Sequence, residues 1–135
     1  MRNRRGSLAK DIRNALFKIC GIPEIKTNAA SSKIADWKKD PRVTEAYTNL
    51  WKANGTELVI INKIIMKAMP KELEENCLTP SIISFALAVC CTVLNPYNNE
   101  IRCTEDTIKK RSSIFLVCIV FIFMSHKIDI NLLLF

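Results

Sequence analysis

The segment from Ile82 to Leu94 contains no charged residue, and it constrains the fold more than any other part of the chain. The Thr79-Pro80 pair before it is typical of a helix start, because threonine can cap the first turn and proline has no amide hydrogen to lose there. Asn95-Pro96 ends the run. A helix of about a dozen residues is too short to span a membrane and suits a buried position. Other elements of the chain must therefore cover it.

Helical periodicity recurs ahead of this segment, whereas strand-type alternation is not sustained. Residues 7–20 predict an amphipathic helix, with Ser7 as its cap and Gly21 as its stop. A short helix is expected through Ile34, Ala35 and Trp37, capped by Ser31 or Ser32.

Asp40-Pro41 predicts the clearest helix start of the chain, again as a cap followed by proline. This helix is expected to end at Asn54-Gly55. Its apolar positions recur at helical spacing, which predicts one core face made of Val43, Tyr47, Leu50 and Trp51.

Thr56 then predicts a helix that runs to about Met69 and is apolar nearly all round, apart from a narrow stripe of Lys63 and Lys67. The β-branched residues around Leu58 also allow a strand. An Asn-Gly hairpin would need a partner strand before it, however, and the preceding residues have a helical pattern.

Together these signals predict an all-α fold, a small single-domain helical bundle of about five to six helices with an apolar C-terminal tail. We assign residues 1–112 to a basic helical domain with its core at about 36–96, and residues 113–135 to the tail. A last helix is expected to open at Thr104.

The tail begins with eleven consecutive apolar residues, Ile114 to Met124. As a helix they span about 16 Å, against about 30 Å for a bilayer core. A longer span would place His126, Lys127 and Asp129 in the membrane at a cost that roughly cancels the apolar gain. The tail therefore has two possible roles. It packs against the core of its own chain or of a second copy, or it anchors the chain in a membrane, with the basic cluster 109–111 beside the membrane surface.

The sequence favours binding over catalysis, so we expect no enzyme, no cofactor and no metal. His126 is the only histidine, and the three glycines are too scattered for a phosphate-binding loop. The cysteines show no zinc-ligand spacing. Because no secretory signal precedes the six cysteines, we expect reduced thiols and a cytoplasmic protein.

The chain carries a formal charge of +7, which attracts anionic partners such as RNA or an anionic lipid surface. Most of the excess lies within residues 1–79. Bases interleaved with an aromatic ring can hold single-stranded nucleic acid without reading its sequence. The candidate nucleic-acid-binding residues are Arg2, Arg4, Arg5, Lys33, Trp37, Lys38, Lys39 and Arg42.

These features predict a protein that binds RNA or another anionic polymer through its basic N-terminal half and self-associates through residues 113–135. The general organisation, a small basic helical body with a long apolar end, is similar to that of helical nucleocapsid-type proteins, an analogy that no motif in the sequence carries. The alternative is a membrane-associated protein, anchored by its C-terminal segment with the basic domain in the cytosol.

Overall fold

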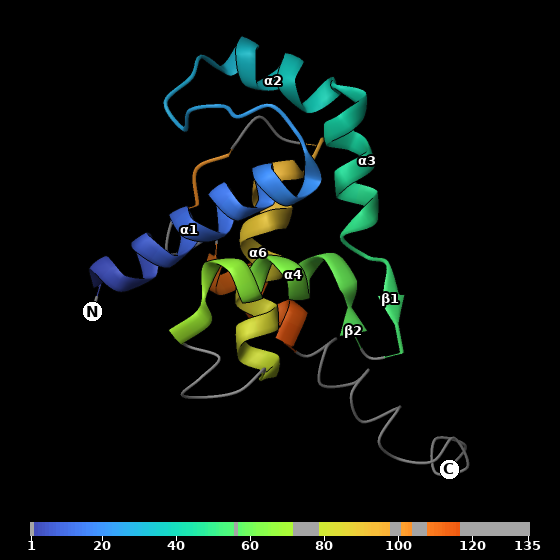
Figure 1. The fold of residues 1–135 in the computed structure, drawn as a ribbon. Helices are drawn as coiled ribbons and strands as arrows, with labels where there is room; N and C mark the ends of the chain where they lie inside the picture. Colours follow the sequence, from blue (N-terminus) through green and yellow to red (C-terminus); the bar gives the residue numbers. More distant parts are fainter. Residues whose placement is uncertain (1, 56, 72–78, 98–100, 104–107, 117–135) are drawn as a thin grey trace.

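The computed structural model describes residues 2–55, 57–71, 79–97, 101–103 and 108–116, with side chains from residue 7 onward. The chain is mostly helical, which confirms the all-α fold class (Figure 1). Residues 108–116 are also helical. The elements are α1 (Arg2–Cys20), α2 (Ser31–Lys39), α3 (Pro41–Asn49), β1 (Ala53–Asn54), β2 (Glu57–Leu58), α4 (Val59–Ala68) and α6 (Pro80–Leu94).

Helix α6 forms the centre of the fold and packs against α1, α3 and α4. It is the uncharged segment of the sequence, and it is buried from Ile83 to Leu94 except at the half-buried Phe85. The Thr79 hydroxyl accepts a hydrogen bond of 3.2 Å from the Ile82 amide, and Pro80 opens the helix. The predicted start and core position of this helix are confirmed.

Helix α1 packs against α4 and α6 and belongs to the same core (Figure 1). It buries Ile12, Leu16 and Phe17 almost completely. The helix begins earlier than the predicted residue 7 and ends as predicted, because Gly21 adopts a φ of 61°, which favours glycine. The expected core at 36–96 is therefore too narrow, since α1 supplies much of the cover over α6.

Asp40 separates α2 from α3. Its carboxylate accepts a hydrogen bond of 2.8 Å from the Arg42 amide, and Pro41 is the first helical residue, as predicted. The start of α2 differs from expectation, because Ala30 occupies its cap position and no side chain there bonds to the backbone. Serine caps are thus absent from α2.

A small hairpin replaces the expected helix start at Thr56. Ala53 pairs with Leu58 and Asn54 with Glu57, in antiparallel register across Gly55, whose φ is 66°. Two-residue hairpin loops need such positive φ values, which glycine adopts at no steric cost. The strand before the turn exists because α3 ends early, so the prediction of one helix from Thr56 to Met69 is wrong at its beginning.

The early end of α3 also changes its predicted core face. Val43 and Leu50 are fully buried and Tyr47 is half-buried, but Trp51 is 45% exposed, so its assignment to the core is wrong. Position 51 lies beyond the helix, where helical spacing no longer determines the direction of the side chain. The Trp51 ring instead contacts Phe115, with ring centroids 5.8 Å apart.

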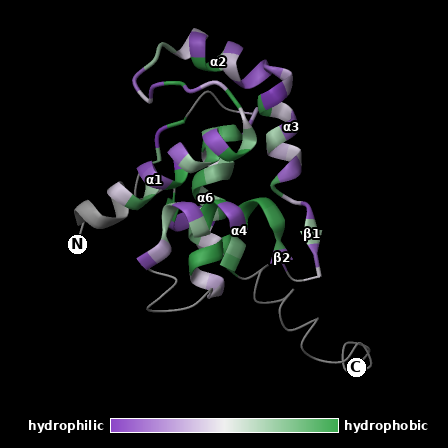
Figure 2. Ribbon diagram, in the orientation of Figure 1, coloured by the Kyte–Doolittle hydropathy of each residue, from purple (hydrophilic) through white to green (hydrophobic). Residues whose placement is uncertain are grey.

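Helix α4 buries Ile61, Ile64 and Ile65, and leaves Lys63 and Lys67 exposed as predicted. Met66, between these lysines in sequence, is 67% exposed, so the helix is not buried all round. In Figure 2, α4 and α6 are mainly hydrophobic, whereas α2 and α3 are mainly hydrophilic.

The helix at residues 108–116 packs near α6, where the Ser84 and Ser112 hydroxyl oxygens are 3.3 Å apart. The predicted start at Thr104 lies outside the described residues, as does the tail beyond residue 116. Within the described ranges, no helix combines the length and the apolarity needed to cross a bilayer.

Candidate anion-binding surface

The candidate bases fall into separate places in the structure. Lys33 and Lys39 are exposed on α2, and Arg42 is exposed at the start of α3. The guanidinium of Arg42 forms an ion pair of 3.0 Å with the Asp40 carboxylate, which offsets its charge. The three arginines at positions 2, 4 and 5 belong to α1, but their side chains lie outside the described residues.

Trp37 is a core residue, which corrects its assignment as a stacking platform. Only 8% of the residue is exposed, and the Phe17 ring packs edge-on against it with centroids 6.0 Å apart. The indole Nε1–H donates a hydrogen bond of 2.7 Å to the Pro23 carbonyl oxygen. A base cannot stack on this covered ring while the fold is intact.

Lys38 is also buried, with 2% exposure, which corrects its assignment as a phosphate contact. Its ammonium donates hydrogen bonds to the carbonyl oxygens of Asn95, at 2.8 Å, and Thr92, at 3.5 Å. Carbonyl groups at a helix C-terminus lack intrahelical partners and carry negative partial charge, so a cation is favoured there. Lys38 therefore stabilises the end of α6.

A hollow of about 780 Å³ beside α1 brings together basic residues that the sequence does not place near one another. This volume lies within the range of about 300–1,000 Å³ typical of small-molecule sites. We name it the α1 hollow. It is lined by Arg13, Asn14 and Phe17 of α1, by Glu24, Ile25, Lys26, Thr27 and Asn28, and by Arg102.

The loop that forms one wall of the α1 hollow is tied to the fold at several points. The Ile22 amide donates to the Phe17 carbonyl at 3.1 Å, and Ile22 itself is buried. The hydrogen bond from the Trp37 indole fixes Pro23. The Ala29 amide donates a hydrogen bond of 3.1 Å to the Lys26 carbonyl oxygen, which closes a turn. The burial of Trp37 therefore positions the loop that carries Lys26.

The described lining of the α1 hollow has a positive net charge. Among the described residues, three basic side chains and one carboxylate line it: Arg13, Lys26, Arg102 and Glu24. Lys26 and Arg102 are exposed, Arg13 is half-buried, and Ile101 next to Arg102 is buried and anchors that segment. Cations in a concave surface concentrate anions near it. This arrangement is suited to a phosphate-bearing ligand.

A second, smaller hollow of about 320 Å³ lies between α1 and the end of α4. Two lysines and one carboxylate are the charged residues of its described lining, which therefore also has a positive net charge. We name it the α4 hollow. Its lining residues are Asp11, Asn14, Ala15 and Lys18 of α1, Lys67 and Ala68 of α4, and Pro70.

None of the predicted candidate residues whose side chains are described lines either hollow. Helical periodicity places Arg13 and Lys18 on the polar face of an amphipathic helix, but it does not mark them as binding residues. Lys26 precedes the polar stretch 27–32, which resembles a linker in the sequence. Only the contacts that fix this loop to the fold show that it forms one wall of the α1 hollow. No local pattern connects Arg102 to α1, because the two are far apart in sequence.

The four described cysteine thiols are not activated as nucleophiles. Burial raises the pKa of Cys91 to about 12 and that of Cys103 to about 11, and it raises the pKa values of Cys20 and Cys90 as well. These thiols stay protonated near neutral pH, and the thiolate is the reactive form. No group of metal-ligating side chains occurs within the ranges described.

No family model, no curated protein and no solved structure matches the chain.

Proposed function

We propose that this protein is a non-enzymatic binding protein that holds RNA on the basic face of α1. The α1 hollow carries the proposal, because three separate segments contribute Arg13, Lys26 and Arg102 to one concave surface. Such a cluster provides both charge and hydrogen-bond donors for a phosphate group. The asparagine and threonine side chains of the hollow add neutral hydrogen-bond donors for phosphate oxygens, and such contacts do not distinguish one RNA sequence from another.

The binding mode that we propose depends on phosphates more than on base stacking. Phe17 lines the α1 hollow but is only 3% exposed, so its ring offers little face to a base. Binding dominated by phosphate contacts weakens as salt rises, because counterions are released from the nucleic acid. We therefore expect strong salt dependence and weak dependence on RNA sequence.

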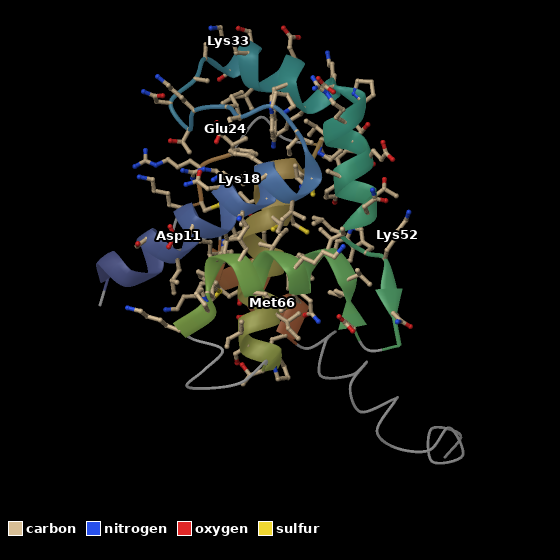
Figure 3. The ribbon with its side chains drawn as sticks, in the orientation of Figure 1. Asp11, Lys18, Glu24, Lys33, Lys52 and Met66 are labelled. Atoms are coloured by element: carbon tan, nitrogen blue, oxygen red, sulfur yellow. The ribbon has the colours of Figure 1, made fainter. Side chains whose placement is uncertain are left out.

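Filter binding of a random RNA oligomer across a salt series tests the proposal. Arg102→Ala should lower the affinity and reduce the steepness of log K against log salt by about 0.7, the value for one lost contact to a single strand. Lys52→Ala is the matched control, because it removes one exposed positive charge well away from Lys18 and Glu24 (Figure 3). Equal effects of the two substitutions would contradict the proposal.

We also propose that copies of the chain associate through residues 113–135. The described start of this segment supports the proposal, because Ile114 is 63% exposed and Phe115 contacts the exposed ring of Trp51. Apolar side chains gathered at a surface favour a protein or membrane contact. Ile114→Asp should lower the mass measured by sedimentation; a monomer that floats with anionic vesicles would favour the membrane alternative.

A further inference from the structure

The α1 hollow and the α4 hollow are neighbours, since Asn14 lines both. Positions 10, 14 and 18 follow one another along a helix face, because four residues turn about 400° and rise about 6 Å. Lys10 and Lys18 are exposed and Asn14 is half-buried. Among the described residues Asn14 marks the boundary between the two hollows, and an exposed lysine lies one helical turn away from it on either side along α1.

Positive charge continues across this boundary. Arg13 lies on the side of α1 that faces Lys26 and Arg102, while Lys18 lies on the side that faces Lys67 of α4. Within the part of the chain that the structure describes, each hollow is lined by one carboxylate, Glu24 in the larger and Asp11 in the smaller. The described lining has a positive net charge in both, so neither hollow by itself marks the end of the basic surface.

We infer that a single strand of RNA crosses α1 at Asn14, with one phosphate in the α1 hollow and another phosphate of the same strand in the α4 hollow. This inference rests on the proposed function and deepens it, because it specifies a chain of phosphates as the ligand. In the larger hollow Arg13, Lys26 and Arg102 contact the phosphate. In the smaller one Lys18 and Lys67 do so.

Asn14 has the appropriate chemistry for the crossing point. Its amide has two donors and one acceptor, so it can bond a phosphate oxygen or a base edge without adding charge. A mononucleotide occupies only one hollow and gains nothing from the other. An oligonucleotide gains from both, because its second contact is intramolecular once the first has formed.

Neutralising a carboxylate of the hollows provides a test in which the affinity is expected to rise, whereas removing a base is expected to lower it. Asp11 opposes a phosphate in the α4 hollow, and Glu24 opposes one in the α1 hollow. Asp11→Asn should therefore strengthen the binding of an oligonucleotide while leaving a mononucleotide unaffected. A gain in affinity cannot result from a variant that fails to fold.

The experiment compares uridine 5′-monophosphate with a uridine hexanucleotide on the full chain, using NMR titration for the weak ligand and fluorescence anisotropy for the hexamer. Lys67→Ala should weaken the hexamer by about two- to five-fold, the size of an exposed charge contact, and leave the mononucleotide unchanged. Arg102→Ala should weaken both ligands, and Lys52→Ala neither.

The two proposals fail in different ways. If Arg102→Ala weakens the hexamer but Lys67→Ala and Asp11→Asn leave it unchanged, the ligand occupies the α1 hollow alone and the crossing at Asn14 is overturned. If Arg102→Ala changes the affinity for neither ligand, the proposed function itself is wrong.

Discussion

The ammonium of Lys38 on α2 donates a hydrogen bond of 2.8 Å to the carbonyl oxygen of Asn95, the residue directly after α6. The two residues are 57 positions apart. Because Lys38 is almost fully buried, its aliphatic stem fills core space while its head satisfies the last turn of the central helix. One side chain thus connects an outer helix to the end of the innermost one.

Lys38→Met should reduce the free energy of unfolding by about 1.5–3 kcal/mol, because methionine keeps most of the stem but leaves carbonyl groups without the charged donor. Urea denaturation measures this loss. Lys39→Met is the matched control, since the neighbouring lysine is exposed, and it should change stability by at most about 0.5 kcal/mol. Similar losses from both variants would show that the bond to Asn95 contributes nothing.

Asp40→Asn should make the free energy of unfolding vary less with pH in the acid range. Hydrogen bonds from the Arg42 side chain and backbone hold the pKa of Asp40 below its ordinary value. The carboxylate therefore stabilises the fold above its unfolded-state pKa of about 3.9, and the contribution is lost as pH falls through the lower folded-state pKa. Asparagine keeps an oxygen for the Arg42 amide but does not titrate.

Wild type should therefore be more stable than Asp40→Asn at neutral pH, and the difference should shrink to nothing at a pH below both pKa values. Urea unfolding at a series of pH values from 7 downward measures it. A difference that stays constant over the whole series would mean that the ion pair with Arg42 does not affect folding.

Ile61→Ala should cost about 2–5 kcal/mol of stability, because Ile61 is fully buried between α4 and its neighbours and its removal leaves a cavity. Lys63→Ala, on the exposed side of the same helix, should change stability by only about half a kcal/mol. Denaturant titration compares the two. Equal effects would mean that α4 is rotated about its axis.

The two tryptophans should differ in fluorescence, because Trp37 is buried and Trp51 is 45% exposed. Acrylamide should quench the emission of Trp37→Phe, which retains Trp51, far more than that of Trp51→Phe. Phe115→Ala should increase the quenching of Trp51 further, since it removes the ring that contacts it. Comparable quenching of the two single-tryptophan variants would contradict the placement of Trp51.

Helix starts are the part of this fold that the sequence predicts best. The Asp40-Pro41 and Thr79-Pro80 pairs act within one helical turn, so no distant residue is needed to interpret them. The direction of Trp37 and Lys38 depends instead on Pro23 and Asn95, 14 and 57 positions away. Local pattern cannot contain that information, which explains why two buried residues resembled a binding motif.

The candidate site shows the same division. The polar face of α1 follows from helical periodicity, and so do Arg13 and Lys18 on it. Arg102 joins that face only through tertiary packing, beside the buried Ile101. Trp51 shows how a local error spreads: α3 ends at Asn49 and a hairpin follows, so Leu50 is still buried but Trp51 leaves the predicted core face.

The central position of α6 has a consequence for synthesis on the ribosome. Helices α1, α3 and α4 are made first, and each of them packs against a helix that ends only at Leu94. Until that residue has emerged, α1 and α4 can pack against each other, but the faces of α1, α3 and α4 that contact α6 stay uncovered and the core cannot be completed. The nascent chain must therefore avoid aggregation until α6 is complete, after which the core can form in one cooperative step.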